Sequence, residues 1–305
     1  MDIRIERVER LRFGNGAPVR AASGVAPLGD GFLVVQDDAT HAAWVVGSAV
    51  SAVRLLPAVE GLEVFDEASG TKHLKPDLEA ACPVAVDGRA GVLVLGSGSS
   101  GARMRWVLLH LDDGEPRSVV ADMTPLYGVV ADALSVAPDA LNMEGACVVG
   151  RTLRWFHRGL PSAGLPSGSV DLDLEGALAA CVGRARPESV PLANPRHHEI
   201  GDVHGVGLAV TDAVALPDGA ILASTAAEDS PNPRDDGPVV GSALVRLESS
   251  RVRDVTPLPL VEGRVAKVEG LMVTESEPRR ARLLAVVDGD QAEQPSLALH
   301  LRVRW

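Results

Sequence analysis

The sequence predicts one all-β domain over residues 1–305, folded as a five-bladed β-propeller. Three observations lead to this prediction. Short apolar runs separated by Gly, Pro and Asp recur along the whole chain, a shared pattern opens five nearly equal units, and the last unit lacks one strand that the N-terminus can supply. A repeat of this length with about four strands per unit is typical of propellers.

The repeated element is a β-hairpin. Strong apolar runs occur at 31–35, 91–95, 220–223 and 282–287, and each follows a turn signal rich in Gly, Pro or Asp. Another short apolar strand precedes each turn, and strand, turn, strand is the pattern of a hairpin. The sequence predicts no long amphipathic helix and only one short helix, over residues 174–182, inside a loop.

The first strand of each unit opens with a polar residue followed by a small one. The five leading residues are spaced by 56, 65, 68 and 57 positions, and 59 more lead from the last round through both termini to the first: Ser23, Glu79, Glu144, Asp212 and Glu269. Nearly equal units that close on themselves indicate a ring.

The last unit offers three strands, at 270–274, 282–287 and 296–305. We expect the N-terminal strand, residues 3–11, to complete this blade, because closing the ring removes an open sheet edge. Six blades are the alternative, since the third and fourth units are long and residues 197–206 are hard to assign.

Composition excludes several classes of protein. Hydrophobic residues make up 46% and charged residues 23%, which is ordinary for a globular chain and excludes wholesale disorder. The net charge of −12 argues against a nucleic-acid or anionic-membrane partner and is compatible with binding a cation. No apolar run approaches the roughly 20 residues that span a bilayer. The oligomeric state is left open.

The first ten residues alternate charged and apolar side chains, which indicates a β-strand and not a signal peptide, so we expect a cytoplasmic protein. The cysteines, Cys82, Cys147 and Cys181, are odd in number and lack zinc-site spacing. We expect three reduced thiols in the core.

The leading residues of the five units predict a metal site. In a propeller the innermost strands run along the central channel, so equivalent positions meet round one axis. Four carboxylates and a hydroxyl, from Ser23, Glu79, Glu144, Asp212 and Glu269, would converge there. Like charges so close need a counter-ion, and oxygen ligands in this number suit Ca²⁺. Solvated turn acids are the alternative interpretation.

Polar residues two positions upstream of the ring share its strand face. Asp77, Asn142 and Lys267 would therefore form a second layer nearer the channel mouth. Lys75 lies beside them. A small-residue loop at 96–101 is followed by Arg103, and Arg158 ends another strand. We expect these cationic side chains to hold an anionic substrate, although Lys267 could instead pair with Glu79 or Asp77.

Candidate proton-transfer groups flank the ring. Asp37, Asp38 and Glu228 end strands near the predicted mouth and could orient a water molecule, while His204 is a candidate general base. The long acidic connection at 228–237 contributes Asp235 and Asp236 as further substrate-binding candidates. No Gly-x-Ser-x-Gly motif and no Cys/His pair at useful spacing supports nucleophilic catalysis.

The ordered motifs along the chain resemble the calcium-activated apyrases. Gln-Asp-Asp-Ala-Thr at 36–40, Leu-Glu at 78–79 with Leu-Gly-Ser-Gly at 95–98, Met-Glu-Gly-Ala at 143–146 with Leu-Arg-Trp-Phe at 153–156, the acidic loop at 228–237 and Val-Glu-Gly-Leu at 268–271 carry the likeness. The resemblance implies a five-bladed propeller with Ca²⁺ in its channel. The chain also resembles bacterial propellers with Lys-Pro-Asp-x-Glu, Gly-Ser-Gly-Ser and Asp-Asp-Gly motifs.

Two departures from the apyrase pattern weaken the expectation of nucleotide specificity more than they weaken the expectation of a metal site. The family's arginine after Asp-Asp is Ala39, and its tryptophan after the second-blade Glu is Ala80. We therefore expect a Ca²⁺-dependent hydrolase that acts on a phosphorylated or otherwise anionic small molecule. The alternatives are a non-catalytic propeller with a structural Ca²⁺ that binds a protein or metabolite, and a calcium-dependent lactonase or esterase.

Overall fold

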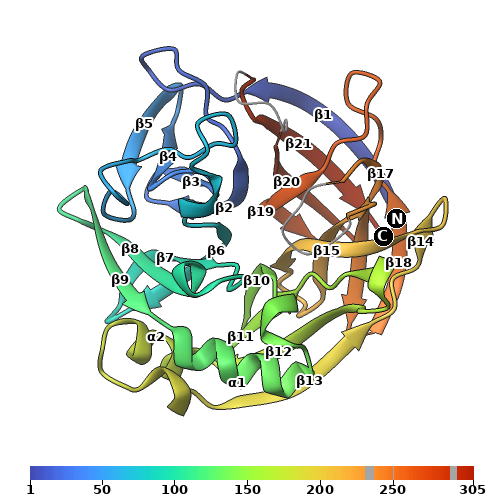
Figure 1. Cartoon of the computed structure of the whole chain (residues 1–305). Helices are drawn as coiled ribbons and strands as arrows, with labels where there is room; N and C mark the ends of the chain where they lie inside the picture. Colours follow the sequence, from blue (N-terminus) through green and yellow to red (C-terminus); the bar gives the residue numbers. More distant parts are fainter. Residues whose placement is uncertain (231–236, 250, 289–293) are drawn as a thin grey trace.

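The computed structural model shows five antiparallel sheets arranged as blades around one axis (Figure 1). The structure describes residues 1–230, 237–249, 251–288 and 294–305. Neighbouring inner strands contact one another all the way round, β2 with β6, β6 with β10, β10 with β15, β15 with β19, and β19 with β2. The prediction of a five-bladed propeller is confirmed, and the six-bladed alternative is wrong.

The first two blades are simple four-stranded meanders. Blade 1 contains β2 (Ala22–Leu28), β3 (Gly31–Gln36), β4 (His41–Val46) and β5 (Ala49–Arg54). Blade 2 contains β6 (Leu78–Val86), β7 (Arg89–Gly96), β8 (Arg105–Asp112) and β9 (Glu115–Asp122).

Blades 3 and 4 carry the insertions that make their sequence units longer. Blade 3 contains β10 (Met143–Val149), β11 (Thr152–His157), β12 (Ser167–Asp173) and β13 (Leu192–His198). Blade 4 contains β14 (Asp202–Val203), β15 (Val206–Ala215), β16 (Ile221–Glu228), β17 (Val239–Glu248) and β18 (Arg251–Pro257).

Blade 5 closes the ring with both ends of the chain. It contains β19 (Val268–Glu277), β20 (Arg280–Val287) and β21 (Leu297–Arg304), and β1 (Asp2–Arg10) pairs antiparallel with β21 as the outer strand. The N-terminal ammonium also bonds to Asp254 on β18 of blade 4. The predicted closure by the N-terminal strand is therefore confirmed.

The core consists of five apolar clusters, one between each pair of adjacent blades in the described structure. Val, Leu and Ala fill most of them, as the aromatic content of 3% requires. The three cysteines are free and buried. No helix among the described residues is both long and apolar enough to cross a membrane.

Two short helices pack at the perimeter of blades 2 and 3. The helix α2 (Leu174–Cys181) matches the predicted helix at 174–182, and Asp173 caps it by accepting from Gly176 N at 2.8 Å. The helix α1 (Thr124–Leu134) was not predicted. Its Tyr127 packs edge-on against Trp155 and donates a hydrogen bond to Gly96 O at 2.6 Å. Because that contact lies 31 residues away in sequence, tertiary packing stabilises α1.

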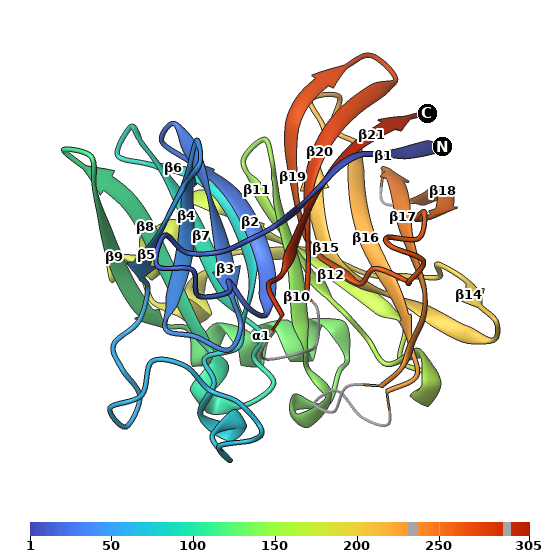
Figure 2. The same ribbon diagram turned by 90° about the horizontal axis from the view of Figure 1, so that it is seen from above.

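The two faces of the disc differ (Figure 2). On one face, tight turns join the inner strand of each blade to the second strand; Asp87 and Gly88 adopt positive φ there, as an Asp-Gly hairpin requires. On the other face the connections are longer and include α1. The inner strands begin and the second strands end at this loop-bearing face, so the predicted site residues gather there.

The inner strands approach one another so closely that the axis accepts only small residues. A Cβ added to Gly24 would lie 3.1 Å from Ala81 N, and one added to Gly145 would lie 2.8 Å from Asp212 Cα. A Cβ on Gly270 would lie 2.8 Å from Gly24 Cα. The small residue that follows each leading residue in the sequence is therefore a packing requirement.

We expect Gly145→Ala to lower the free energy of unfolding by about 1–3 kcal/mol, the usual cost of overpacking. The matched control is Gly128→Ala in α1, where an added Cβ meets no atom within 4 Å. This control should raise stability by about 0.5–1 kcal/mol, because Ala is favoured over Gly in a helix. Urea unfolding of both variants measures the difference, and equal stabilities would contradict the close-packed axis.

Candidate functional site

A β-bulge in every inner strand places one residue of each blade at the loop-bearing end of the axis. The register shifts fall at Ser23, Glu79, Glu144, Thr211 and Glu269. A bulge turns its extra residue out of the regular alternation. We call these five residues the axial ring.

Asp212 is a correction to the predicted ring. It pairs regularly with Ser224, and the preceding Thr211 occupies the bulge. Thr211 Oγ1 donates to Val268 O at 2.5 Å, and Ser23 Oγ donates to Leu78 O at the same distance, so both hydroxyls bind the next blade. The sequence does hold a signal for this shift, since an apolar residue precedes every ring member, as Val210 precedes Thr211.

Asp212 instead lies fully buried among the inner strands. Its Oδ2 accepts a hydrogen bond from Leu271 N at 2.7 Å, which links blade 4 to blade 5. Burial raises the pKa of this carboxyl well above its usual range. Asp212 therefore has a structural contact in the described chain that the repeat pattern did not predict.

The upstream layer forms close to the ring. Asn142 Nδ2 donates to Glu144 Oε1 at 2.7 Å, and Lys267 Nζ lies 2.9 Å from Glu269 Oε1. Asp77 is buried and receives hydrogen bonds from Ser97 and Ser99. The two serines belong to the small-residue loop at 96–101, so this loop holds a carboxylate of its own chain.

The predicted anion-binding side chains all contact carboxylates. Lys75 Nζ lies 2.5 Å from Asp37 Oδ2 and 2.7 Å from Asp77 Oδ1. Arg103 Nη1 lies 2.8 Å from Asp77 Oδ2. On the other side of the axis, Arg158 bonds to Glu144 at 3.3 Å and Glu228 at 2.7 Å, and Lys267 also bonds to Glu228 at 2.9 Å.

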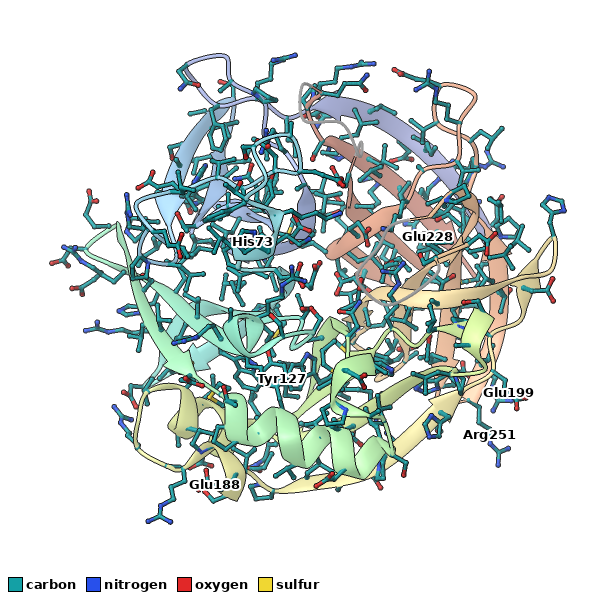
Figure 3. The ribbon with its side chains drawn as sticks, viewed as in Figure 1. His73, Tyr127, Glu188, Glu199, Glu228 and Arg251 are labelled. Atoms are coloured by element: carbon teal, nitrogen blue, oxygen red, sulfur yellow. The ribbon has the colours of Figure 1, made fainter. Side chains whose placement is uncertain are left out.

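Glu228 extends from the end of β16 toward the middle of the disc (Figure 3). Its carboxylate accepts from Arg158, Ser230 and the backbone of Gly237, and it also pairs with Lys267. Burial alone would raise the pKa of Glu228, but Lys267 and Arg158 outweigh burial and lower it to about 2. This saturated, strongly acidic carboxyl is a poor proton acceptor, contrary to its predicted catalytic role.

One predicted catalytic residue, His204, lies away from the axis. His204 occupies the exposed turn between β14 and β15, a hairpin at the perimeter of the disc in Figure 1, so it cannot act at the axis. Asp235 and Asp236 lie outside the described residues. Asp38 forms an ion pair at 2.6 Å with Arg20, which sequence reasoning missed, and burial raises the pKa of Asp38 to about 6.

Within this cluster, the carboxylates of the three ring glutamates, Glu79, Glu144 and Glu269, are the least compensated by neighbouring cations and hydrogen-bond donors. Burial, followed by the nearby Asp77 and Glu144, raises the pKa of Glu79 well above its usual range. Burial likewise raises the pKa of Glu144 to about 7 and raises that of Glu269. Glu79 has no hydrogen bond or ion pair to the described residues, and Oε2 of Glu269, itself only 9% exposed, has no partner among them.

The described cluster has two more negative than positive side chains. Its seven carboxylates are Asp37, Asp38, Asp77, Glu79, Glu144, Glu228 and Glu269, and its five cations are Arg20, Lys75, Arg103, Arg158 and Lys267. One oxygen each from Asp37, Asp77 and Glu79 lies within 4.8 Å of the others. This arrangement suits a hard divalent cation, which prefers oxygen ligands.

Comparison with known proteins places the chain in a family. Residues 71–292 match the DUF6910 family, described as a family of unknown function, and the chain belongs to it. No curated protein matches the sequence. The comparisons therefore lend no support to membership of the apyrases.

The chain is similar to several solved structures at low sequence identity. A glutaminyl cyclase from Myxococcus xanthus has a TM-score of 0.51 at 11% identity, covering 99% of this chain and 97% of that one. A mannose phosphorylase from Leishmania mexicana has a TM-score of 0.49 at 14% identity, covering 97% and 88%. A gluconolactonase from Xanthomonas campestris has a TM-score of 0.34 at 12% identity, covering 100% and 73%. At these identities the likeness concerns the fold alone.

The ion pair of Arg103 with Asp77 gives a test of whether the cations are architectural. We expect Arg103→Gln to lower the free energy of unfolding by about 3 kcal/mol, because it leaves a buried carboxylate less compensated. The control, Arg89→Gln, breaks an exposed pair with Asp112 and should change stability by less than about 0.5 kcal/mol. Urea unfolding measures both. A loss below 1 kcal/mol in Arg103→Gln would instead leave this cation available to a ligand.

Proposed function

We propose that this member of the DUF6910 family binds one Ca²⁺ ion at the axial ring. The observation that carries the proposal is the surplus of two negative side chains at the loop-bearing end of the axis, centred on Glu79, which has no hydrogen-bond donor among the described residues. A buried carboxylate in that state is unfavourable unless it is protonated or a cation reaches it. A divalent ion would match the charge difference.

The donor set supports this ion. Glu79, Glu144 and Glu269 would supply carboxylate oxygens, and Asp37 and Asp77 have oxygens near that of Glu79. All are hard oxygen ligands, and Ca²⁺ takes six to eight of them in flexible geometry. The buried and unpartnered Oε2 of Glu269 is a further ligand candidate. Ser23 and Thr211 have committed their hydroxyl protons to backbone carbonyls and are weaker candidates.

The contacts support cation binding more strongly than anion binding. Lys75, Arg103 and Arg158 would meet a phosphate only by releasing carboxylates that they already hold. A substrate with several negative charges would also face the surplus acids. We therefore place binding of the ion first and hydrolysis of an anionic small molecule second.

We expect protein stripped with EDTA to bind about one Ca²⁺ per chain and to unfold a few degrees higher when Ca²⁺ is added, because a ligand of the folded state stabilises it. Glu79→Gln should weaken Ca²⁺ affinity at least tenfold, and should raise the melting temperature of the metal-free protein by removing a buried charge. The control is Glu188→Gln at the perimeter (Figure 3).

Calorimetric titration and thermal unfolding measure these effects, with Mg²⁺ as a competing ion. Absence of binding at millimolar Ca²⁺, or unchanged binding by Glu79→Gln, would contradict the site. Binding with equal loss in Glu188→Gln would show a non-specific charge effect and would also contradict it.

Hydrolysis is the second candidate because Glu79 is only partly buried, so solvent reaches that side of the ring. When bound, Ca²⁺ would polarise a substrate oxygen or lower the pKa of a bound water molecule. Asp37 and Asp38 lie beside the ring and would orient that water; Glu228 and His204 are unsuitable for the reasons above.

A phosphate-release screen over nucleotides and sugar phosphates tests this second candidate. We expect turnover in Ca²⁺ that disappears with EDTA and falls at least a hundredfold in Glu79→Gln, with Glu188→Gln unchanged. If Ca²⁺ binds as expected but no phosphate is released, the protein is a calcium-binding propeller without this activity. Phosphate release that persists in EDTA would contradict the metal dependence.

A further inference from the structure

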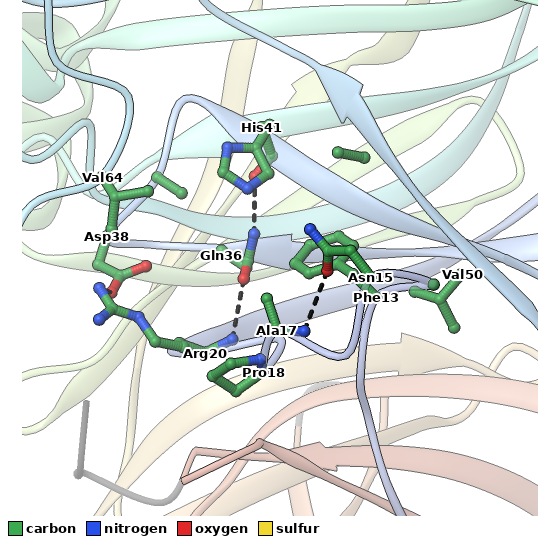
Figure 4. A pocket seen from close by; sticks show the side chains of 13 residues that line it. Phe13, Asn15, Ala17, Pro18, Arg20, Gln36, Asp38, His41, Val50 and Val64 are labelled. Atoms are coloured by element: carbon green, nitrogen blue, oxygen red, sulfur yellow. Dashed lines mark hydrogen bonds and ion pairs between the residues drawn. The ribbon is translucent and has the colours of Figure 1, made fainter. Parts of the chain in front are cut away.

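A separate pocket of about 650 Å³ opens beside blade 1 (Figure 4). Its outer wall is formed by residues 13–18, which lead into β2, and by Val50 and Ala52 on the outer strand β5. Its inner end is formed by Arg20, Gln36 and Asp38. A volume of this size is typical of small-molecule sites. None of the ring glutamates lines it.

Hydrogen bonds inside the wall hold the pocket in shape. Gln36 accepts from Arg20 N at 2.9 Å through its side-chain oxygen and donates to His41 O at 3.1 Å through its side-chain nitrogen. Asn15 Oδ1 accepts from Ala17 N at 3.0 Å, which fixes the turn of the outer wall. A site whose walls are held by their own contacts loses little entropy when a ligand binds.

One side of the pocket is apolar and aromatic. Phe13 and His41 form a tilted pair with ring centroids 5.7 Å apart, and Pro18, Val50 and Val64 extend this surface. Burial lowers the pKa of His41, so its imidazole is neutral at pH 7. This side suits the flat apolar face of a ring compound and offers no charge to an ion.

The polar end is also neutral overall, because Arg20 and Asp38 pair at 2.6 Å. An anion would meet the carboxylate of Asp38, and a cation would compete with Arg20 for that carboxylate. Oδ1 of Asp38 is buried and receives no hydrogen bond from the described residues. A buried acceptor without a donor is costly, so a small rotation of the Asp38 side chain toward a neutral ligand that donates a hydrogen bond would be favoured.

We propose that this pocket binds a neutral carbohydrate, whose ring packs on Phe13 and whose hydroxyl groups hydrogen-bond to Asp38. A sugar ring has an apolar C–H face and a rim of hydroxyls, which matches the two sides of the pocket. No ring glutamate lines this pocket, although Asp38 also lies beside Asp37 of the proposed Ca²⁺ site, so titrations in Ca²⁺ and in EDTA test the two proposals separately.

The test is calorimetric titration or saturation-transfer NMR of the full chain with a panel of neutral mono- and disaccharides, each in Ca²⁺ and in EDTA. We expect at least one sugar to bind with a dissociation constant of a few millimolar or lower in both conditions. Asp38→Asn should weaken binding about tenfold or more, since a hydrogen bond to a charged acceptor is lost. Ala52→Trp, an exposed position on the wall, should abolish it by filling the pocket.

Matched controls lie outside the pocket. Asp30→Asn makes the same chemical change at an exposed turn on the opposite face, and Val46→Ala shortens an exposed apolar side chain; neither should alter sugar binding. Binding unaffected by Ala52→Trp would overturn the proposal, as would a panel without any binder or preferential binding of uncharged nucleosides. Melting temperatures of all variants exclude loss of folding as the cause.

Discussion

Close contact of the five inner strands is the constraint on which the rest of the structure depends. In four blades the residue after the bulge is small, which lets the strands approach closely: Gly24, Ala80, Gly145 and Gly270. In the fourth blade it is Asp212, whose carboxylate bonds to the backbone of the neighbouring blade. Each bulge then turns one polar residue to the mouth of the channel, so the close packing that holds the ring together also gathers the acids.

Placing several carboxylates close together with little access to solvent is electrostatically unfavourable. The surrounding cationic side chains offset most of this unfavourable energy. Lys75 links Asp37 with Asp77, Lys267 links Glu228 with Glu269, and Arg158 links Glu144 with Glu228. These bridges join residues from different blades and so contribute to alignment of the loop-bearing face. The compensation is incomplete at Glu79, and this is the basis of our proposal that the site binds a cation. These ion pairs explain why an acidic protein has basic residues near the axis, and the explanation does not require an anionic substrate.

The division of the disc into two faces separates stability from binding. Tight turns on one face require particular backbone conformations, as at Asp87 and Gly88, and leave little room for variation. Longer connections on the other face carry the ion-pair network and the pocket beside blade 1. Arg20 and Asp38 belong to both features, since their pair lies at the inner end of the pocket and next to Asp37. The two proposed sites therefore lie on the same face of the propeller and share these two residues.

The local sequence pattern was sufficient to predict the hairpin strands and the way in which the blades close into a ring. Alternating apolar runs with Gly and Asp turns specify hairpins wherever they occur, and the nearly equal spacing of the five predicted leading residues, Ser23, Glu79, Glu144, Asp212 and Glu269, specifies five units. The strand pairing of both termini followed because an open edge is unfavourable in any sheet. The short helix at Asp173 was also predictable, since its cap lies in the adjacent sequence.

Tertiary structure alone decided which polar residues touch. The shift from Asp212 to Thr211 depends on the position of a bulge, and a one-residue slip reverses which face a side chain occupies. The helix α1 forms because Tyr127 finds Trp155 and Gly96 across the fold. Each predicted anion-binding cation pairs with at least one carboxylate that lies 14 or more positions away in the sequence, as Arg158 does with Glu144 and Glu228. Sequence spacing locates such residues in the same region, but only the packed blades determine whether a charge faces a ligand or another side chain.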